Sequence, residues 1–96
     1  MINLDKDSYE ELIQIFESYC PKAEIWAYGG RVKGEFHEGS DLDLTIKSFN
    51  EEGKSLSHLK MLLTESNIPI FVDINEFDAL PDYFKKEILK RYERIF

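Results

Sequence analysis

The stretch DLDLTIK, from Asp41 to Lys47, alternates strictly between polar and apolar side chains. In an extended strand, successive side chains point to opposite faces of the sheet, so Leu42, Leu44 and Ile46 share one face. The polar residues of the stretch then fall on the other face. The pattern therefore predicts a half-buried strand, and the fold must cover one face of its sheet with apolar side chains.

Two further strands and three helices are expected around this strand. Residue types that favour strands occur at 23–30, a stretch that ends in two glycines, and at 68–75. Apolar residues recur at helical spacing over 8–19 and 51–66, and a last helix is expected from Pro81, a favoured first-turn residue. The inner stripe predicted for that last helix consists of Phe84, Ile88, Leu89, Tyr92 and Ile95. The order α-β-β-α-β-α predicts an α+β fold with helices packed on one face of a small sheet.

The composition is that of one domain spanning residues 1–96. A hydrophobic content of 43%, with seven Phe and five Tyr, can fill one core, and the single Cys20 allows no internal disulfide. Nineteen acidic and twelve basic residues give a formal charge of −7, which disfavours direct binding of nucleic acid. The sequence shows no apolar run of the roughly 18–20 residues that a membrane span needs and no signal-peptide pattern, so a cytoplasmic protein is expected.

Three aspartates are predicted on the polar face of the sheet. Asp41 and Asp43 project in the same direction from one strand, with Cα atoms about 6–7 Å apart. Asp73 has the corresponding parity on the third strand, so three carboxylates meet if these strands are neighbours. Hard oxygen ligands of this kind favour Mg²⁺ or Mn²⁺ over zinc. The alternative is a solvated strand surface, but aspartate is depleted in strands, and three on one face carry a cost that a surface role leaves unexplained.

A glycine turn stands close to these aspartates in the sequence. Gly29 and Gly30 end the first predicted strand, where the lack of a Cβ lets backbone N–H groups approach a phosphate. Arg31 and Lys33 follow, with charges suited to a triphosphate. Two glycines alone are more often an ordinary tight turn. Together with Asp41 and the other carboxylates they predict a nucleotide site, because nucleotide chemistry needs phosphate donors opposite metal-binding carboxylates.

The combined motif resembles the signature of the DNA polymerase β-like nucleotidyltransferase superfamily, G-S-x-x-x-G followed by S-D-[LIVF]-D-[LIVF]. The residues that match it are Gly29, Arg31, Gly34, Ser40, Asp41, Leu42, Asp43 and Leu44. Asp73 stands where the superfamily has its third carboxylate, on the strand after the next helix. Nearly the whole chain resembles the shortest version of this fold, the minimal nucleotidyltransferase (MNT) proteins of prokaryotes.

The resemblance implies transfer of a nucleoside monophosphate, usually AMP from ATP, to a hydroxyl acceptor. It implies that Asp41 and Asp43 hold two Mg²⁺ ions, and that Asp73 helps to bind the second ion and can act as a base. The residues that it implies at the nucleotide are Gly29, Gly30, Arg31, Lys33 and Ser40. Of these, Arg31 and Lys33 would steady the phosphates.

The resemblance also implies a partner. MNT proteins are typically encoded with a small helical HEPN protein, an RNase-type toxin, and act as its antitoxin by binding it and by AMP-modifying one of its tyrosines. A hetero-oligomer is therefore expected. An antitoxin that is catalytically weak or inactive and acts by binding alone is the alternative. An aminoglycoside-modifying transferase is a weaker alternative, because such enzymes usually carry a further domain for the acceptor.

One residue departs from the superfamily pattern. Gly30 stands where a serine usually follows the first glycine, and that serine hydroxyl reaches a nucleotide phosphate. Its loss removes a hydrogen bond worth about 0.5–1.5 kcal/mol, or up to about 3 kcal/mol to a charged group. Gly30→Ser is therefore expected to tighten ATP binding if the site is active. The tRNA-terminal nucleotidyltransferases resemble this chain in having a Gly-Gly pair at the corresponding turn.

Overall fold

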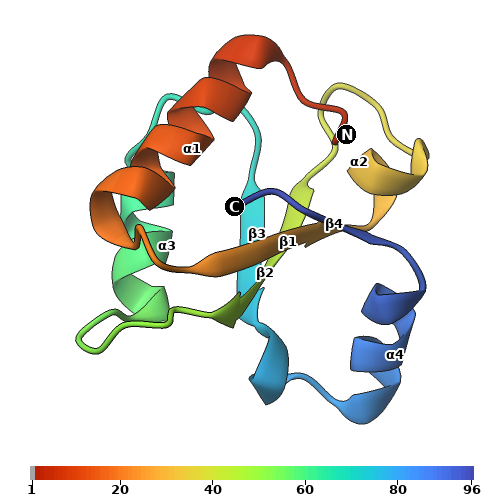
Figure 1. The fold of residues 1–96 in the computed structure, drawn as a ribbon. Helices are drawn as coiled ribbons and strands as arrows, with labels where there is room; N and C mark the ends of the chain where they lie inside the picture. The colour runs from red at the N-terminus through yellow and green to blue at the C-terminus, as the bar shows by residue number, and fades with distance from the viewer. Residues whose placement is uncertain (1) are drawn as a thin grey trace.

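The computed structural model describes residues 2–96, which form a four-stranded mixed sheet flanked by helices (Figure 1). The helices are α1 (Lys6–Tyr19), α2 (Gly30–Lys33), α3 (Leu56–Thr64), the 3-10 helix η1 (Phe77–Ala79) and α4 (Asp82–Lys90). The strands are β1 (Glu24–Tyr28), β2 (Leu42–Ser48), β3 (Val72–Glu76) and β4 (Tyr92–Arg94). Their order in the sheet is β3-β2-β1-β4; β2 and β3 are parallel, and β1 is antiparallel to β2 and β4. Within residues 2–96, no helix is long and apolar enough to cross a membrane.

Side-chain caps set where the longer helices begin. The carboxylate of Asp5 accepts a hydrogen bond from the backbone N–H of Ser8 at 3.0 Å, and this bond lowers the pKa of Asp5. The hydroxyl of Ser55 caps α3 in the same way, accepting from the N–H of His58 at 3.1 Å. The helix predicted over 51–66 therefore begins only after Ser55, and it ends at Thr64.

The main core lies on one face of the sheet, which α1 and α3 cover (Figure 1). The alternation of β2 is confirmed, because Leu42, Leu44 and Ile46 are all buried at this face. The helices contribute Leu12, Phe16, Leu59 and Leu63 to the same core. Full burial of each such side chain stabilises the fold by roughly 1.5–3 kcal/mol. The predicted α+β fold class is therefore confirmed.

The last helix packs on the opposite face. Phe84 and Ile88 of α4 form a second cluster with Trp26 and Tyr28, and the rings of Tyr28 and Phe84 meet edge to face at 5.9 Å. Successive residues of β1 point to opposite faces, so this cluster lies away from the main core. The prediction of helices on one face is thus correct for α1 and α3 and wrong for α4.

The chain leaves the helical conformation after Lys90, earlier than predicted. Residues 92–94 pair with β1 as β4, and the ring of Tyr92 stacks on Trp26 at 4.1 Å. The free edge of β1 offers backbone hydrogen bonds that a longer helix would leave unmade. Leu89 and Tyr92 are 52% and 41% exposed, so their predicted place in an inner helical stripe was wrong.

Candidate active site

The three predicted carboxylates gather where β2 and β3 begin. Asp43 and Asp73 are direct partners in the parallel ladder between these strands, which confirms that the two strands are neighbours. Asp41 stands one residue before β2, and its charge acts on Asp43. Paired residues on neighbouring strands lie about 4.7–4.9 Å apart in the backbone, close enough for their carboxylates to share a ligand.

These carboxylates oppose one another electrostatically. The pKa of Asp43 is raised above its ordinary value of 3.8, first by burial and then by the charges of Asp73 and Asp41. The folded protein therefore holds this proton more tightly than the unfolded chain does. As the pH rises through 3.8 and then through the raised pKa, ionised Asp43 reduces the stability of the fold. A bound cation would offset this cost.

The donor set fits a hard divalent cation. It consists of carboxylate oxygens alone, which Mg²⁺ and Mn²⁺ prefer, and their mutual repulsion is what a cation relieves. In the described part of the chain, no three acidic, histidine or cysteine side chains already surround one point as ligands. Asp41 and Asp73 are exposed, so their side chains are free to turn toward Asp43.

The glycine turn lies directly against these carboxylates. Gly29 has φ +79° and ψ −157°, a backbone conformation that residues with a Cβ rarely adopt. A Cβ at Gly29 would also lie 2.5 Å from Oδ2 of Asp43. The glycine is therefore required both by the turn and by the contact. The two halves of the motif, predicted separately, touch at this point.

Gly30 meets a different restriction. Its carbonyl accepts hydrogen bonds from the N–H groups of Gly34 at 2.8 Å and Glu35 at 3.0 Å, which folds the chain back over α2. A Cβ at Gly30 would lie 2.5 Å from the carbonyl oxygen of Glu35. A serine would therefore force this backbone to shift, so the expectation that Gly30→Ser simply restores a phosphate contact does not fit the structure.

Arg31 orders the loop that leads to Asp41. Only 5% of this residue is exposed, and its guanidinium lies over the ring of Phe36, 5.0 Å from the centroid. Its N–H groups donate to the backbone carbonyls of Asn3, His37, Glu38 and Ser40, at 2.6, 3.4, 2.9 and 3.0 Å. The hydroxyl of Ser40 accepts from the N–H of His37 at 2.9 Å. Direct phosphate contacts of Arg31 and Ser40 stay predictions.

Lys33 lines a small hollow of about 180 Å³ beside the glycine turn. The residues around this hollow are Tyr28, Gly29, Lys33, Phe84, Glu87, Ile88 and Arg91. Gly29 lines this hollow and also lies against the Asp43 carboxylate, so it links the hollow with the aspartates. Phe84 and Arg91 were not predicted here, since only the position of α4 on this face brings them to the turn.

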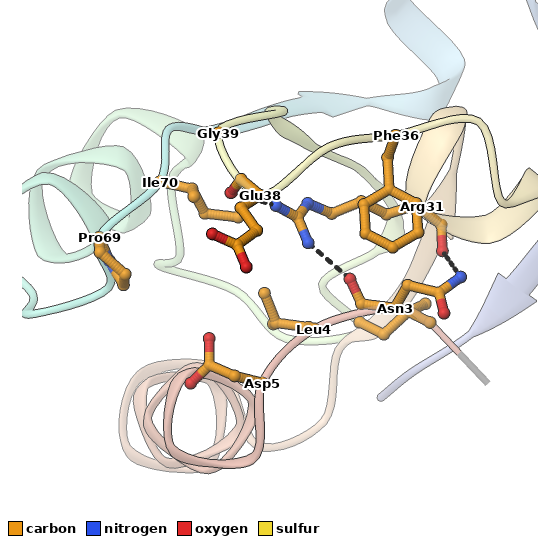
Figure 2. A pocket seen from close by; sticks show the side chains of 10 residues that line it. Asn3, Leu4, Asp5, Arg31, Phe36, Glu38, Gly39, Pro69 and Ile70 are labelled. Atoms are coloured by element: carbon orange, nitrogen blue, oxygen red, sulfur yellow. Dashed lines mark hydrogen bonds between the residues drawn. The ribbon is translucent and has the colours of Figure 1, made fainter.

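A larger hollow of about 770 Å³ surrounds Arg31 on another part of the molecule (Figure 2). Its walls include the N-terminal residues 2–5, the loop with Phe36 and Glu38, and the segment with Ile70. The predicted aspartates do not line it. The charge of Arg31 is already directed at backbone carbonyls, and the carboxylates of Asp5 and Glu38 would repel a triphosphate. We therefore place the candidate nucleotide site at the aspartates.

Three polar residues of the same sheet face were not predicted as part of the site. The hydroxyl of Thr45 donates to Oδ1 of Asn75 at 2.6 Å, and Nδ2 of Asn75 donates to the hydroxyl oxygen of Tyr28 at 2.9 Å. Thr45 follows Asp43 by two residues, and Asn75 follows Asp73 by two. The parity that located the aspartates would have located these two residues as well.

Comparison with known proteins agrees with this geometry. The family model for "Polymerase beta, Nucleotidyltransferase" matches residues 10–96. The chain belongs to this nucleotidyltransferase family. The nucleotidyltransferase is 34% identical over 79 residues to the "Probable protein adenylyltransferase MntA" of Haemophilus influenzae, covering 81% of this chain and 69% of the relative.

A solved structure shares the fold of this nucleotidyltransferase. It is a "toxin-antitoxin with AMP-PNP", and one of its chains superposes with a TM-score of 0.70 at 17% identity, covering 92% of this chain and 72% of that one. The family match and the MntA relative together confirm the resemblance to MNT-type nucleotidyltransferases.

Proposed function

We propose that this nucleotidyltransferase transfers AMP from ATP to a hydroxyl group of a partner protein. The observation that carries the proposal is the direct pairing of Asp43 and Asp73, with Gly29 packed against the Asp43 carboxylate. Carboxylate oxygens of this kind can bind a metal ion, and they lie beside a glycine backbone that a phosphate could approach closely, which supports the proposal. Similarity to a protein adenylyltransferase supports AMP as the transferred group and ATP as its donor.

In this proposal the chain's own residues bind and orient the reactants. Asp41, Asp43 and Asp73 would hold two Mg²⁺ or Mn²⁺ ions. When bound, such ions neutralise triphosphate charge and make the acceptor hydroxyl more acidic. The acceptor oxygen bonds to the α-phosphorus, pyrophosphate leaves, and Asp73 takes the hydroxyl proton. Lys33, exposed beside Gly29, is placed to steady the phosphates.

In this proposal Arg31 and Ser40 order the loop that precedes Asp41. Both hold residues 35–40 in place, and that segment leads directly into Asp41. Gly29 and Gly30 begin the same stretch and offer backbone N–H groups to the nucleotide. The 96 residues would thus act as one minimal nucleotidyltransferase domain.

The acceptor in this proposal is a tyrosine of a helical HEPN-family toxin in the cytoplasm, with which the chain forms a hetero-oligomer as its antitoxin. Similarity to MntA supports a protein acceptor, and the fold shared with a chain of a toxin-antitoxin complex supports a toxin partner. The second candidate is an antitoxin that acts by binding alone. The observation that favours it is Gly30, which stands where the superfamily pattern has a serine and beside which the carbonyl of Glu35 leaves no space for a side chain.

A transfer assay separates these two candidates. The protein is incubated with Mg²⁺, ATP labelled at the α-phosphate and the HEPN protein encoded beside it. Label is expected on the partner, and Asp41→Asn should abolish it. Asp7→Asn, a matched change on α1 at the opposite face of the sheet, should leave transfer intact. A partner that binds the protein and gains no label would refute the enzymatic proposal and leave the binding-only antitoxin.

A further inference from the structure

A chain of hydrogen bonds runs beside the paired carboxylates. Thr45 and Asn75 are partners in the ladder between β2 and β3, two residues after the pair formed by Asp43 and Asp73. Asn75 bridges the strands, accepting from the Thr45 hydroxyl at 2.6 Å and donating to the Tyr28 hydroxyl oxygen at 2.9 Å. The three polar groups therefore form one connected row next to the candidate active site.

The burial of Thr45 determines which group donates and which accepts in this row of hydrogen bonds. Thr45 is 0% exposed, so its hydroxyl proton has no water to bind and needs an acceptor in the protein. The Asn75 amide oxygen meets it at 2.6 Å, whereas the Asn75 backbone carbonyl is 3.5 Å away, too far for a good hydrogen bond. The amide oxygen thus faces Thr45, and the amide N–H₂ faces Tyr28.

The Tyr28 hydroxyl must then donate in another direction. Its oxygen accepts from Asn75, so its single proton points away from that amide. Tyr28 is the ladder partner of Asp43 across β1 and β2. Burial raises the pKa of Tyr28 most, and the charges of Asp43 and Asp73 raise it further, so both carboxylates act on the hydroxyl. As neighbours across the ladder, Tyr28 and Asp43 project from the same face of the sheet, so the Tyr28 proton can turn toward these carboxylates.

We propose that Tyr28 is a positioning residue whose hydroxyl, oriented by Asn75 and Thr45, donates a hydrogen bond to the Asp43 and Asp73 carboxylate pair and holds it for cation binding. The proposal rests on the proposed function, because it assigns a role in the same site. Hydrogen bonds from groups behind metal ligands fix the ligand oxygens, and their loss typically lowers metal affinity or activity about 10- to 100-fold. Tyr28 would do this from a buried position, with 9% of its surface exposed.

The ring of Tyr28 serves a separate purpose, which makes the test selective. It packs against Phe84 and lines the hollow beside Gly29, and Tyr28→Phe keeps both contacts. Only the hydroxyl is lost. Tyr83→Phe is the matched control, because Tyr83 lies on α4 with 70% of its surface exposed.

The test measures Mn²⁺ binding by titration in the absence of ATP and partner protein. Tyr28→Phe is expected to weaken Mn²⁺ affinity about 10-fold or more, whereas Tyr83→Phe should not change it. Thr45→Val frees the Asn75 amide to turn and to accept from Tyr28, so it should weaken affinity similarly. Combined with Tyr28→Phe, Thr45→Val should cause no further loss, because both changes remove the same hydrogen bond.

Each other outcome has a distinct meaning. If the unaltered protein binds Mn²⁺ and Tyr28→Phe lowers only the thermal unfolding temperature, the hydroxyl is structural and the inference is overturned. Additive losses in the double variant would also overturn it, since the two residues would then act separately. If the unaltered protein binds no Mn²⁺, the proposed function itself fails, and the role of Tyr28 fails with it.

Discussion

Asp43→Asn is expected to abolish AMP transfer and, at the same time, to make the fold more stable at neutral pH. Loss of a carboxylate that is proposed to hold the cations should remove several kcal/mol of transition-state stabilisation, which is roughly a 10³-fold decrease in rate. The gain in stability follows from the raised pKa of Asp43, which reflects burial and the charges of Asp73 and Asp41. The neutral amide avoids both costs.

The pH dependence of this stability gain has a defined sign. At neutral pH, ionised Asp43 destabilises the folded state, so Asp43→Asn should unfold at a higher temperature than the unaltered protein. Below the ordinary pKa of 3.8, Asp43 is protonated in both the folded and the unfolded state, and the difference should disappear. Thermal unfolding over a pH series, without divalent cations, measures this. Asp7→Asn should show no such gain.

A fall in unfolding temperature for Asp43→Asn at neutral pH would contradict this reasoning. It would mean that the Asp43 carboxylate stabilises the fold, as a capping or hydrogen-bonding group does. Added Mg²⁺ provides an internal check, because a cation that binds only the folded state raises its stability. The unaltered protein should be stabilised by Mg²⁺, and Asp43→Asn should respond less.

Arg31→Met is expected to cause the largest loss of stability among the predicted site residues. It removes the donor from the backbone carbonyls of Asn3, Glu38 and Ser40, whereas the carbonyl of His37 keeps a hydrogen bond from the N–H of Ser40 at 2.9 Å. An unpaired carbonyl costs up to about 1–3 kcal/mol, and water reaches these exposed or half-buried residues, so a decrease of about 2–4 kcal/mol in the free energy of unfolding is expected. Urea unfolding measures it, with exposed Lys86→Met as the control.

Arg31→Lys distinguishes a structural role from a direct phosphate contact. A lysine keeps the positive charge, but its compact ammonium group cannot replace a planar guanidinium that reaches several carbonyls at once. The structural role therefore predicts that Arg31→Lys is nearly as unstable as Arg31→Met. If Arg31→Lys keeps full stability, and Arg31→Met only raises the KM for ATP, then Arg31 contacts the phosphates and the loop contacts are secondary.

Local sequence patterns predicted the positions of the three aspartates in the sheet better than they predicted the packing around them. The parity of Asp41, Asp43 and Asp73 follows from the two-residue repeat of a strand, which a sequence displays directly. The only additional assumption needed to bring the aspartates together was that β2 and β3 are neighbours in the sheet. The same repeat pointed to Thr45 and Asn75, although only the structure shows that their side chains meet.

Long-range contacts explain where the sequence was insufficient. The apolar spacing from Phe84 to Ile95 fits a helix, and only the free edge of β1 draws Tyr92 and its neighbours into a strand. The charge of Arg31 is evident from the sequence. Its carbonyl partners are not, because they come from two separate segments of the chain. The sequence shows only that Gly30 replaces the serine of the superfamily pattern. The structure adds that the carbonyl of Glu35 occupies the space that a side chain at Gly30 would need.

The central claim is that the aspartates and the Gly29 turn form one nucleotide and metal site. Crystals grown with Mn²⁺ and a non-hydrolysable ATP analogue test it most directly, because anomalous scattering locates the manganese. Manganese peaks are expected within about 2.0–2.4 Å of the Asp43 and Asp73 carboxylate oxygens, with the triphosphate along Gly29. Manganese and nucleotide in the hollow around Arg31, with none at the aspartates, would contradict it.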